Sequence, residues 1–131
     1  MPKHAHAIVW IDHHEARIIY FSLDASEETV VHPDHPPRSL ASKAGSREGR
    51  RHHEDPEFYA DVTAALAEVP AFLVVGPASA KTELVKYLHR HAPRLIEHLA
   101  AVETMDRATD SELLARARHE FKRIDDMRPR F

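Results

Sequence analysis

Residues 6–22 read HAIVWIDHHEARIIYFS, which is two apolar runs joined by a short polar turn. The first run, residues 6–12, places apolar side chains at consecutive positions, a pattern typical of a strand covered on both faces of a sheet. The second run, residues 16–22, is rich in β-branched and aromatic residues, and residues 27–32 form a weaker, more alternating run. These segments predict an antiparallel meander whose first strand is central and whose third strand lies near an edge.

The second half of the chain alternates helical patterns with apolar runs. Prolines and capping residues mark the expected helix ends, because proline suits the first helical turn and interrupts a helix interior. The expected elements are helices from residue 55 to Pro70, from a Ser79 cap to Pro93, and from a capping box at residues 109–112, with strands at residues 71–76 and 99–102.

The predicted order is therefore β-β-β, a long loop, and then α-β-α-β-α. This is the order of the ribonuclease H-like fold, and it predicts a mixed sheet in one α/β domain over residues 1–131. A chain of 131 residues with a net charge of -3 is typical of a soluble globular domain. The chain has no cysteine, which excludes disulfides, and no apolar stretch approaches the roughly 18 residues of a membrane span. We expect a cytoplasmic protein with no membrane partner and no cofactor.

A basic segment separates the two patterned halves. The loop at residues 34–54 has no hydrophobic periodicity, and a connection of this length inside a domain is normally functional or disordered. Within it, residues 38–53 carry five basic side chains against one acidic one, while the remainder of the chain carries 13 basic and 20 acidic side chains. A basic segment on an acidic body favours a phosphate-rich partner, and a merely solvated loop is the alternative.

Arginine and lysine neutralise phosphates, and glycine lets the backbone approach a ligand closely. Aromatic side chains are absent from residues 38–53, so we expect electrostatic contact there rather than base stacking. The two histidines at the end of the segment would add charge at lower pH. The predicted nucleic-acid contacts are Arg38, Lys43, Gly45, Arg47, Gly49, Arg50, Arg51, His52 and His53.

A second candidate is the turn at residues 76–82, GPASAKT, between a predicted strand and a predicted helix. Free backbone amides at a helix start can hold an anion, with Gly76, Ser79 and Lys81 as the contributing residues. The turn lacks the spacing of a phosphate-binding Walker loop. The alternative is a tight structural turn in which the Ser79 side chain caps the helix.

Acidic and histidine side chains give a third set of candidates. Nucleases of the ribonuclease H-like fold gather carboxylates around two divalent metals, and Asp12 and Glu103 would serve here in that role. Glu15 and two acids that also suit turn and cap positions, Asp106 and Asp110, complete the acidic set. The pair His13 and His14, beside Asp12 and Glu15, is the one cluster worth testing for a metal, although dispersed surface histidines are the alternative and we predict no metal site.

Several stretches together resemble a known family. They are IVWIDHHEARI (residues 8–18), SKAGSREGRRHHEDPEFYADV (42–62), VVGPASAKTELVKYL (74–88) and VETMDRATDSELLARARHEF (102–121). In this order and spacing they resemble a bacterial family described as translational machinery proteins. That family is related to the central domain of archaeal and eukaryotic class-one release factors and of Pelota, and the resemblance implies a ribonuclease H-like fold.

The resemblance also implies a role and a limit to it. In release factors the corresponding loop carries GGQ, which supports hydrolysis of peptidyl-tRNA, whereas residues 45–50 here read GSREGR and the chain has no glutamine. Pelota, which acts in ribosome rescue, also lacks GGQ in this domain. We therefore expect a non-catalytic module that binds ribosomal RNA or tRNA, on stalled or idle ribosomes, with a partner protein supplying the missing domains. The alternatives are the metal-dependent nuclease and a homo-oligomeric protein-interaction module.

Overall fold

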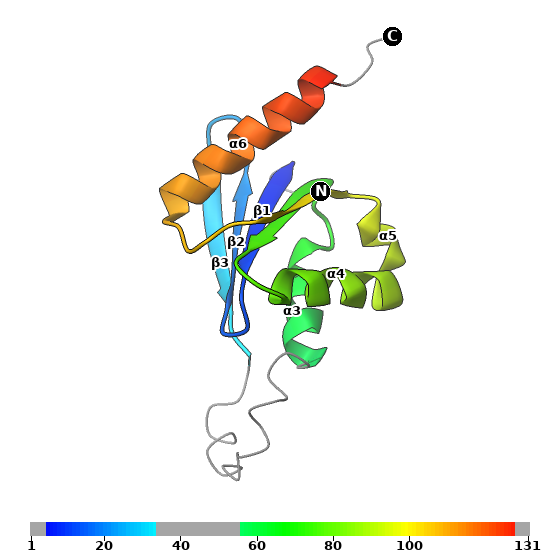
Figure 1. The fold of residues 1–131 in the computed structure, drawn as a ribbon. Helices are drawn as coiled ribbons and strands as arrows, with labels where there is room; N and C mark the ends of the chain where they lie inside the picture. The colour runs from blue at the N-terminus through cyan, green and yellow to red at the C-terminus, as the bar shows by residue number, and fades with distance from the viewer. Residues whose placement is uncertain (1–4, 34–55, 128–131) are drawn as a thin grey trace.

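A computed structural model describes residues 5–33 and 56–127 (Figure 1). The predicted α/β class is confirmed, since strands and helices form one layered unit. The elements in chain order are β1 (His6–Ile11), β2 (Ala16–Phe21), β3 (Ser26–Val31), α3 (Pro56–Leu66), β5 (Ala71–Gly76), α4 (Ala80–His91), α5 (Pro93–Ile96), β6 (Leu99–Thr104) and α6 (Asp110–Met127). The predicted loop at residues 34–54 lies outside the described residues. Within the described ranges, no helix is long and apolar enough to cross a membrane.

The five strands form one mixed sheet in the order β3-β2-β1-β5-β6. β1 pairs antiparallel with β2, and β2 pairs antiparallel with β3, so the first three strands form the expected meander. β5 lies parallel to β1 on its other side, and β6 lies parallel to β5. The strand with the most continuous apolar sequence is therefore at the centre of the sheet, where both of its faces are covered.

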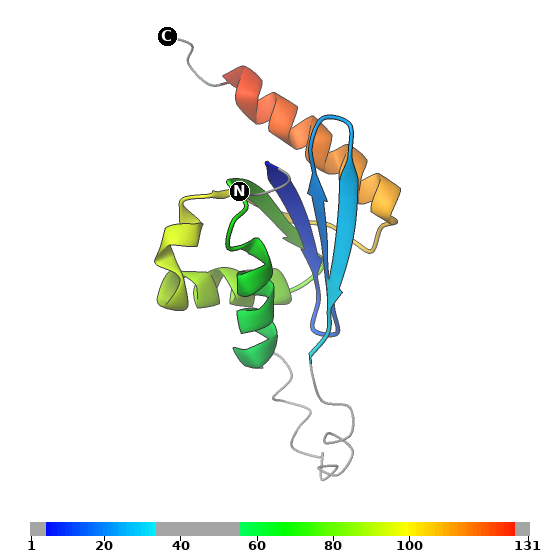
Figure 2. The same cartoon turned by 180° about the vertical axis from the view of Figure 1, so that it is seen from behind.

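Helices cover both faces of this sheet (Figures 1 and 2). Alternate residues of β1 point to opposite faces, because side chains alternate along a strand. Ala7, Val9 and Ile11 belong to the core under α3, α4 and α5. Ile8 and Trp10 belong to the second core, under α6. Every residue of β1 from Ala7 onward is at most 1% exposed, because one core covers each face of this strand.

The structure departs from the sequence predictions at helix ends. The first helix ends at Leu66, before Pro70, although Val69 is still buried. A short helix that the sequence did not predict, α5, follows α4 at Pro93.

The capping box predicted at residues 109–112 is present at the start of α6. The Thr109 amide donates to Glu112 Oε1 (2.8 Å), and the Glu112 amide donates to Thr109 Oγ1 (3.1 Å).

Gly76 lies at a close approach between two parallel strands. A Cβ built at this position would fall well inside contact distance of the carbonyl oxygen of Ile11, which is a backbone atom of β1 and cannot rotate away. The glycine that ends β5 is therefore required by packing against β1, which accounts for it without any ligand.

We predict that Gly76→Ala destabilises the protein by about 1–3 kcal/mol, because the added methyl group pushes β5 away from β1. Urea unfolding measures the change. Ala78→Ser, which adds an atom at an exposed position of the same turn, is the control and should change stability by less than about 0.5 kcal/mol. Equal stability of Gly76→Ala and wild type would contradict the close approach.

The ring of His6 joins the N-terminus of β1 to α6. It lies 5.5 Å from the ring of Phe21, nearly parallel to it, and 4.3 Å from the ring of Phe121. Burial among these rings lowers the pKa of His6 from its ordinary value of 6.5, and the nearby Asp125 carboxylate opposes that shift.

The lowered pKa predicts a loss of stability in acid. The unfolded chain binds a proton at His6 near pH 6.5, whereas the folded chain binds it only at lower pH, so stability falls as the pH drops through 6.5 and levels off below the folded pKa. His6→Phe keeps the stacking and removes this titration. We expect the free energy of unfolding of the wild type to fall relative to that of His6→Phe between about pH 8 and about pH 5. Parallel pH profiles would contradict it.

Candidate functional site

The basic segment predicted to bind nucleic acid lies outside the described residues. The chain leaves the described part after β3 and returns to it at the start of α3, and these two ends lie at the same end of the molecule (Figures 1 and 2). The residues concerned are Arg38, Lys43, Gly45, Arg47, Gly49, Arg50, Arg51, His52 and His53.

The turn at residues 76–79 is held by its own chain. Lys81 Nζ donates to the carbonyl oxygen of Ala78 (2.5 Å), so its ammonium group folds back on the turn. The prediction that the Ser79 side chain caps α4 is wrong, because it makes no capping hydrogen bond. The physical reason is that Ser79 already has a helical backbone (φ -87°, ψ -10°), whereas a capping side chain needs an extended one. Binding of an anion at this turn stays a prediction.

The carboxylates predicted for a nuclease site serve separate structural contacts. Asp12 Oδ1 accepts hydrogen bonds from the backbone amides of His14 (2.7 Å) and Glu15 (2.9 Å), which closes the turn between β1 and β2. Glu103 Oε1 accepts from Arg116 Nη2 (2.8 Å) and Nε (3.1 Å) on α6. Among residues 5–33 and 56–127, no group of three or more histidine, aspartate or glutamate side chains is placed to hold a metal ion.

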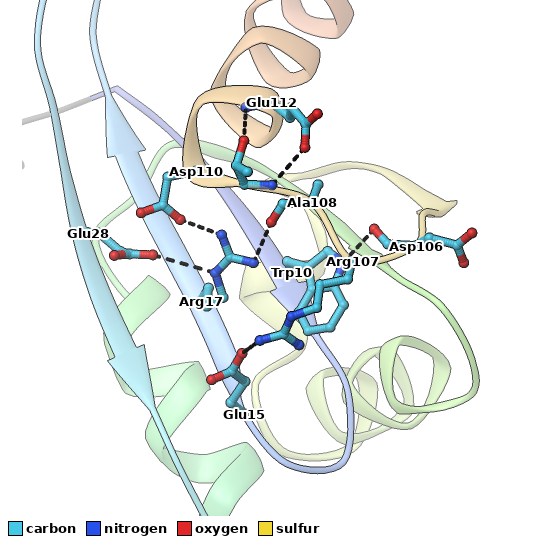
Figure 3. Close-up of polar contacts among 10 residues, drawn as sticks. Trp10, Glu15, Arg17, Glu28, Asp106, Arg107, Ala108, Asp110 and Glu112 are labelled. Carbon is cyan, nitrogen blue, oxygen red and sulfur yellow. Dashed lines mark hydrogen bonds and ion pairs between the residues drawn. The ribbon is translucent and has the colours of Figure 1, made fainter.

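An arginine cluster that the sequence did not predict lies on the face of the sheet covered by α6, next to the start of that helix (Figure 3). Arg17, on β2, is only 11% exposed and joins three segments. Its Nη1 donates to the carbonyl oxygen of Ala108 (2.7 Å), its Nη2 donates to Asp110, and its Nε lies 3.6 Å from Glu28 on β3. The one available signal was a charged residue inside the apolar run ARIIYF.

The two carboxylates beside Arg17 have shifted pKa values of opposite sign. The hydrogen bond from Arg17 lowers the pKa of Asp110. Burial, together with the neighbouring Asp110 carboxyl group, raises the pKa of Glu28. Such opposed shifts occur at catalytic acid–base pairs, but here the side chain of Asp110 is 53% exposed and the guanidinium lies between the segments it joins. We therefore assign the cluster a structural role.

The indole of Trp10 extends this cluster toward the loop before α6. Its Nε1 donates to the carbonyl oxygen of Asp106 (3.1 Å), and the guanidinium of Arg107 lies 5.3 Å from its ring centroid. Arg107 Nη2 also pairs with Glu15 (2.9 Å). Two of the acids predicted from the sequence, Glu15 and Asp110, thus pair with arginines near the start of α6, whereas Asp106 contributes only its backbone carbonyl oxygen.

We predict that Arg17→Ala destabilises the protein by about 1–3 kcal/mol, because it leaves a part-buried carbonyl and two partly exposed carboxylates without their shared donor. Arg17→Lys should recover only part of this loss, since one ammonium cannot replace a planar guanidinium that reaches all three acceptors. Lys122→Ala, which removes the exposed pair with Asp126, is the control and should change stability by less than about 1 kcal/mol. Equal effects of Arg17→Ala and Lys122→Ala in chemical unfolding would sink this assignment.

Comparison with known proteins finds similarity in fold. No model of a known protein family matches the chain, and neither does any curated protein. Pelota from Archaeoglobus fulgidus is similar with a TM-score of 0.61 at 16% identity, over 90% of this chain and 30% of that one. Pelota from Thermoplasma acidophilum has a TM-score of 0.54 at 15% identity (85% and 30% covered), and Dom34 from S. cerevisiae has 0.54 at 7% (86% and 31%). The chain thus shares the fold of a part of these proteins and spans less than a third of their length.

Proposed function

We propose that this chain is a translation-associated module that binds ribosomal RNA or tRNA, acting in the cytoplasm on stalled or idle ribosomes. The observation that carries the proposal is the fold that it shares with part of Pelota and Dom34. Dom34 is described as a translation termination-like factor involved in RNA quality control pathways and interacting with Hbs1. The motif order described above supports placing the chain in the bacterial family related to the central domain of these factors.

The fold assignment within this proposal is ribonuclease H-like. The sheet order β3-β2-β1-β5-β6, with an antiparallel meander followed by two parallel strands, supports that assignment. Pelota and Dom34 extend beyond the part whose fold this chain shares, and we propose that this module acts together with a partner protein.

The contact surface in this proposal is the basic segment, residues 38–53. In the sequence, its five basic side chains come after β3 and before α3, and the rest of the chain carries a net negative charge. Arg47, Arg50 and Arg51 are the leading phosphate contacts, and Gly45 and Gly49 permit a close backbone approach. Because the segment lacks the GGQ triplet, we propose binding without hydrolysis of peptidyl-tRNA.

We predict that replacing Arg47, Arg50 and Arg51 together with alanine weakens binding to fluorescently labelled tRNA. Each lost phosphate contact should flatten the slope of log affinity against log salt by about 0.7–0.9, so the triple variant should lose roughly 2–3 units of slope. Anisotropy titrations at several salt concentrations measure this slope.

The matched control is Lys122→Ala/Arg123→Ala, which removes two cations that already pair with acids of α6. It should leave the slope nearly unchanged. A wild-type slope near zero, or a triple variant indistinguishable from wild type, would overturn the proposed role of the basic segment.

A further inference from the structure

A groove on the surface of α4 is lined by basic and aromatic side chains and lies outside the contact surface proposed above. It encloses about 620 Å³ between α3 and α4, beside Pro56. Its lining includes Tyr59 of α3 and Lys86, Tyr87, His89, Arg90 and His91 of α4. Because residues three and four apart share a helix face, Lys86 with Arg90 and Tyr87 with His91 form two adjacent rows along the same surface.

The positive charge in this groove is not neutralised by the described part of the chain. Ten lysines and arginines lie in residues 5–33 and 56–127, and seven of them donate to a protein carboxylate or carbonyl oxygen. The three that meet no such oxygen within those ranges are Lys86, Arg90 and Arg94, all exposed and all on α4 or α5. Two of these three cations, Lys86 and Arg90, line the groove, and Arg94 lies in α5, which follows α4.

The groove also contains a row of rings. Tyr59 and Tyr87 lie 6.1 Å apart, and Tyr87 and His91 lie 4.4 Å apart, measured between ring centroids. Tyr59 is buried and supports the row from below, Tyr87 is half-buried, and His91 is exposed. Rings that are fixed at their base and open on one side can stack with an unpaired base, whereas a base pair within a duplex offers no free face.

The combination of free cations and exposed rings is the one that proteins use for single-stranded nucleic acid. The helix dipole accounts for basic residues in the last turn of α4, but it accounts for neither the half-buried Tyr87 nor Arg94 beyond the helix end. Glu83 is the one acidic residue in the groove lining, one turn before Tyr87. Its negative charge repels phosphate at that end of the groove, so the end near Arg90 is the more favourable place for a phosphate group.

We propose that this groove is a second RNA contact, which binds an unpaired nucleotide with its base against Tyr87 and His91 and its phosphates against Lys86 and Arg90. The inference rests on the proposed RNA-binding function but not on the basic segment. It supplies the base stacking that the segment, which has no aromatic residue, does not provide.

The test uses the full chain and a fluorescently labelled oligouridine of about ten nucleotides. Tyr87→Ala should weaken binding by roughly 5-fold to 100-fold, the range expected for one stacked base, whereas Tyr87→Phe should bind like wild type. Lys86→Ala/Arg90→Ala should flatten the salt slope by about 1.4, since each phosphate on a single strand contributes about 0.7. Thermal unfolding checks that each variant is folded, and Lys122→Ala/Arg123→Ala is the control for lost charge.

Combined variants and competitors distinguish a failure of the groove inference from a failure of the proposed function. In the background of Arg47, Arg50 and Arg51 replaced by alanine, Tyr87→Ala should still weaken binding. If the segment variant weakens binding and the groove variants do not, the groove inference is wrong and the proposed function stands; if neither does, both are wrong. Equal competition by polyglutamate and unlabelled oligouridine, or the same loss for Tyr87→Phe as for Tyr87→Ala, would show that base stacking is not involved and would overturn the groove assignment.

Discussion

The rest of the structure depends on covering both faces of the central strand β1. Its side chains from Ala7 to Ile11 are almost fully buried, and burying one large apolar side chain contributes about 1.5–3 kcal/mol. α3 and α4 cover one face of β1, and α6 covers the other. The two crossover connections therefore follow from the apolar sequence of β1. Gly76 shows how tight this arrangement is, because β5 approaches β1 too closely for any side chain at that position.

The two helical layers differ in how their charges are satisfied. On the α6 side, Arg116 and Arg123 pair with Glu103 and Glu120, and Arg118 donates to the carbonyl oxygens of Ser22 and Leu23. The hydrogen bond from Arg123 lowers the pKa of Glu120, which keeps that nearly buried carboxylate charged. On the α4 side, Lys81 donates to the carbonyl oxygen of Ala78, whereas Lys86, Arg90 and Arg94 meet no oxygen of the described residues. The arginines of α6 thus have their hydrogen-bond acceptors within the chain, whereas Lys86 and Arg90 remain available for the phosphates of the proposed RNA contact.

The sequence predicted the fold class and most elements because its strongest patterns are local. Continuous apolar runs marked β1 and β5, and the capping box at Thr109 marked the start of α6. It did not predict the Arg17 cluster, because the acceptors Ala108, just before α6, and Asp110, its first residue, lie 91 and 93 positions after Arg17 in the sequence. It also did not predict the α4 groove, because Tyr59 and Tyr87 meet only once α3 packs beside α4. Ser79 had the composition of a cap, but its backbone geometry does not let the side chain act as one.

The central claim is that this chain associates with ribosomal particles through charged contacts with RNA. Sedimentation of the purified chain with ribosomes through a sucrose cushion, over a series of salt concentrations, tests it most directly. The proposal predicts that the chain pellets with ribosomes at low salt and is progressively released as salt rises, with crosslinks from α4 and from the basic segment mapping to RNA. A chain that stays in the supernatant at every salt concentration, or that pellets independently of salt with crosslinks only to ribosomal proteins, would contradict it.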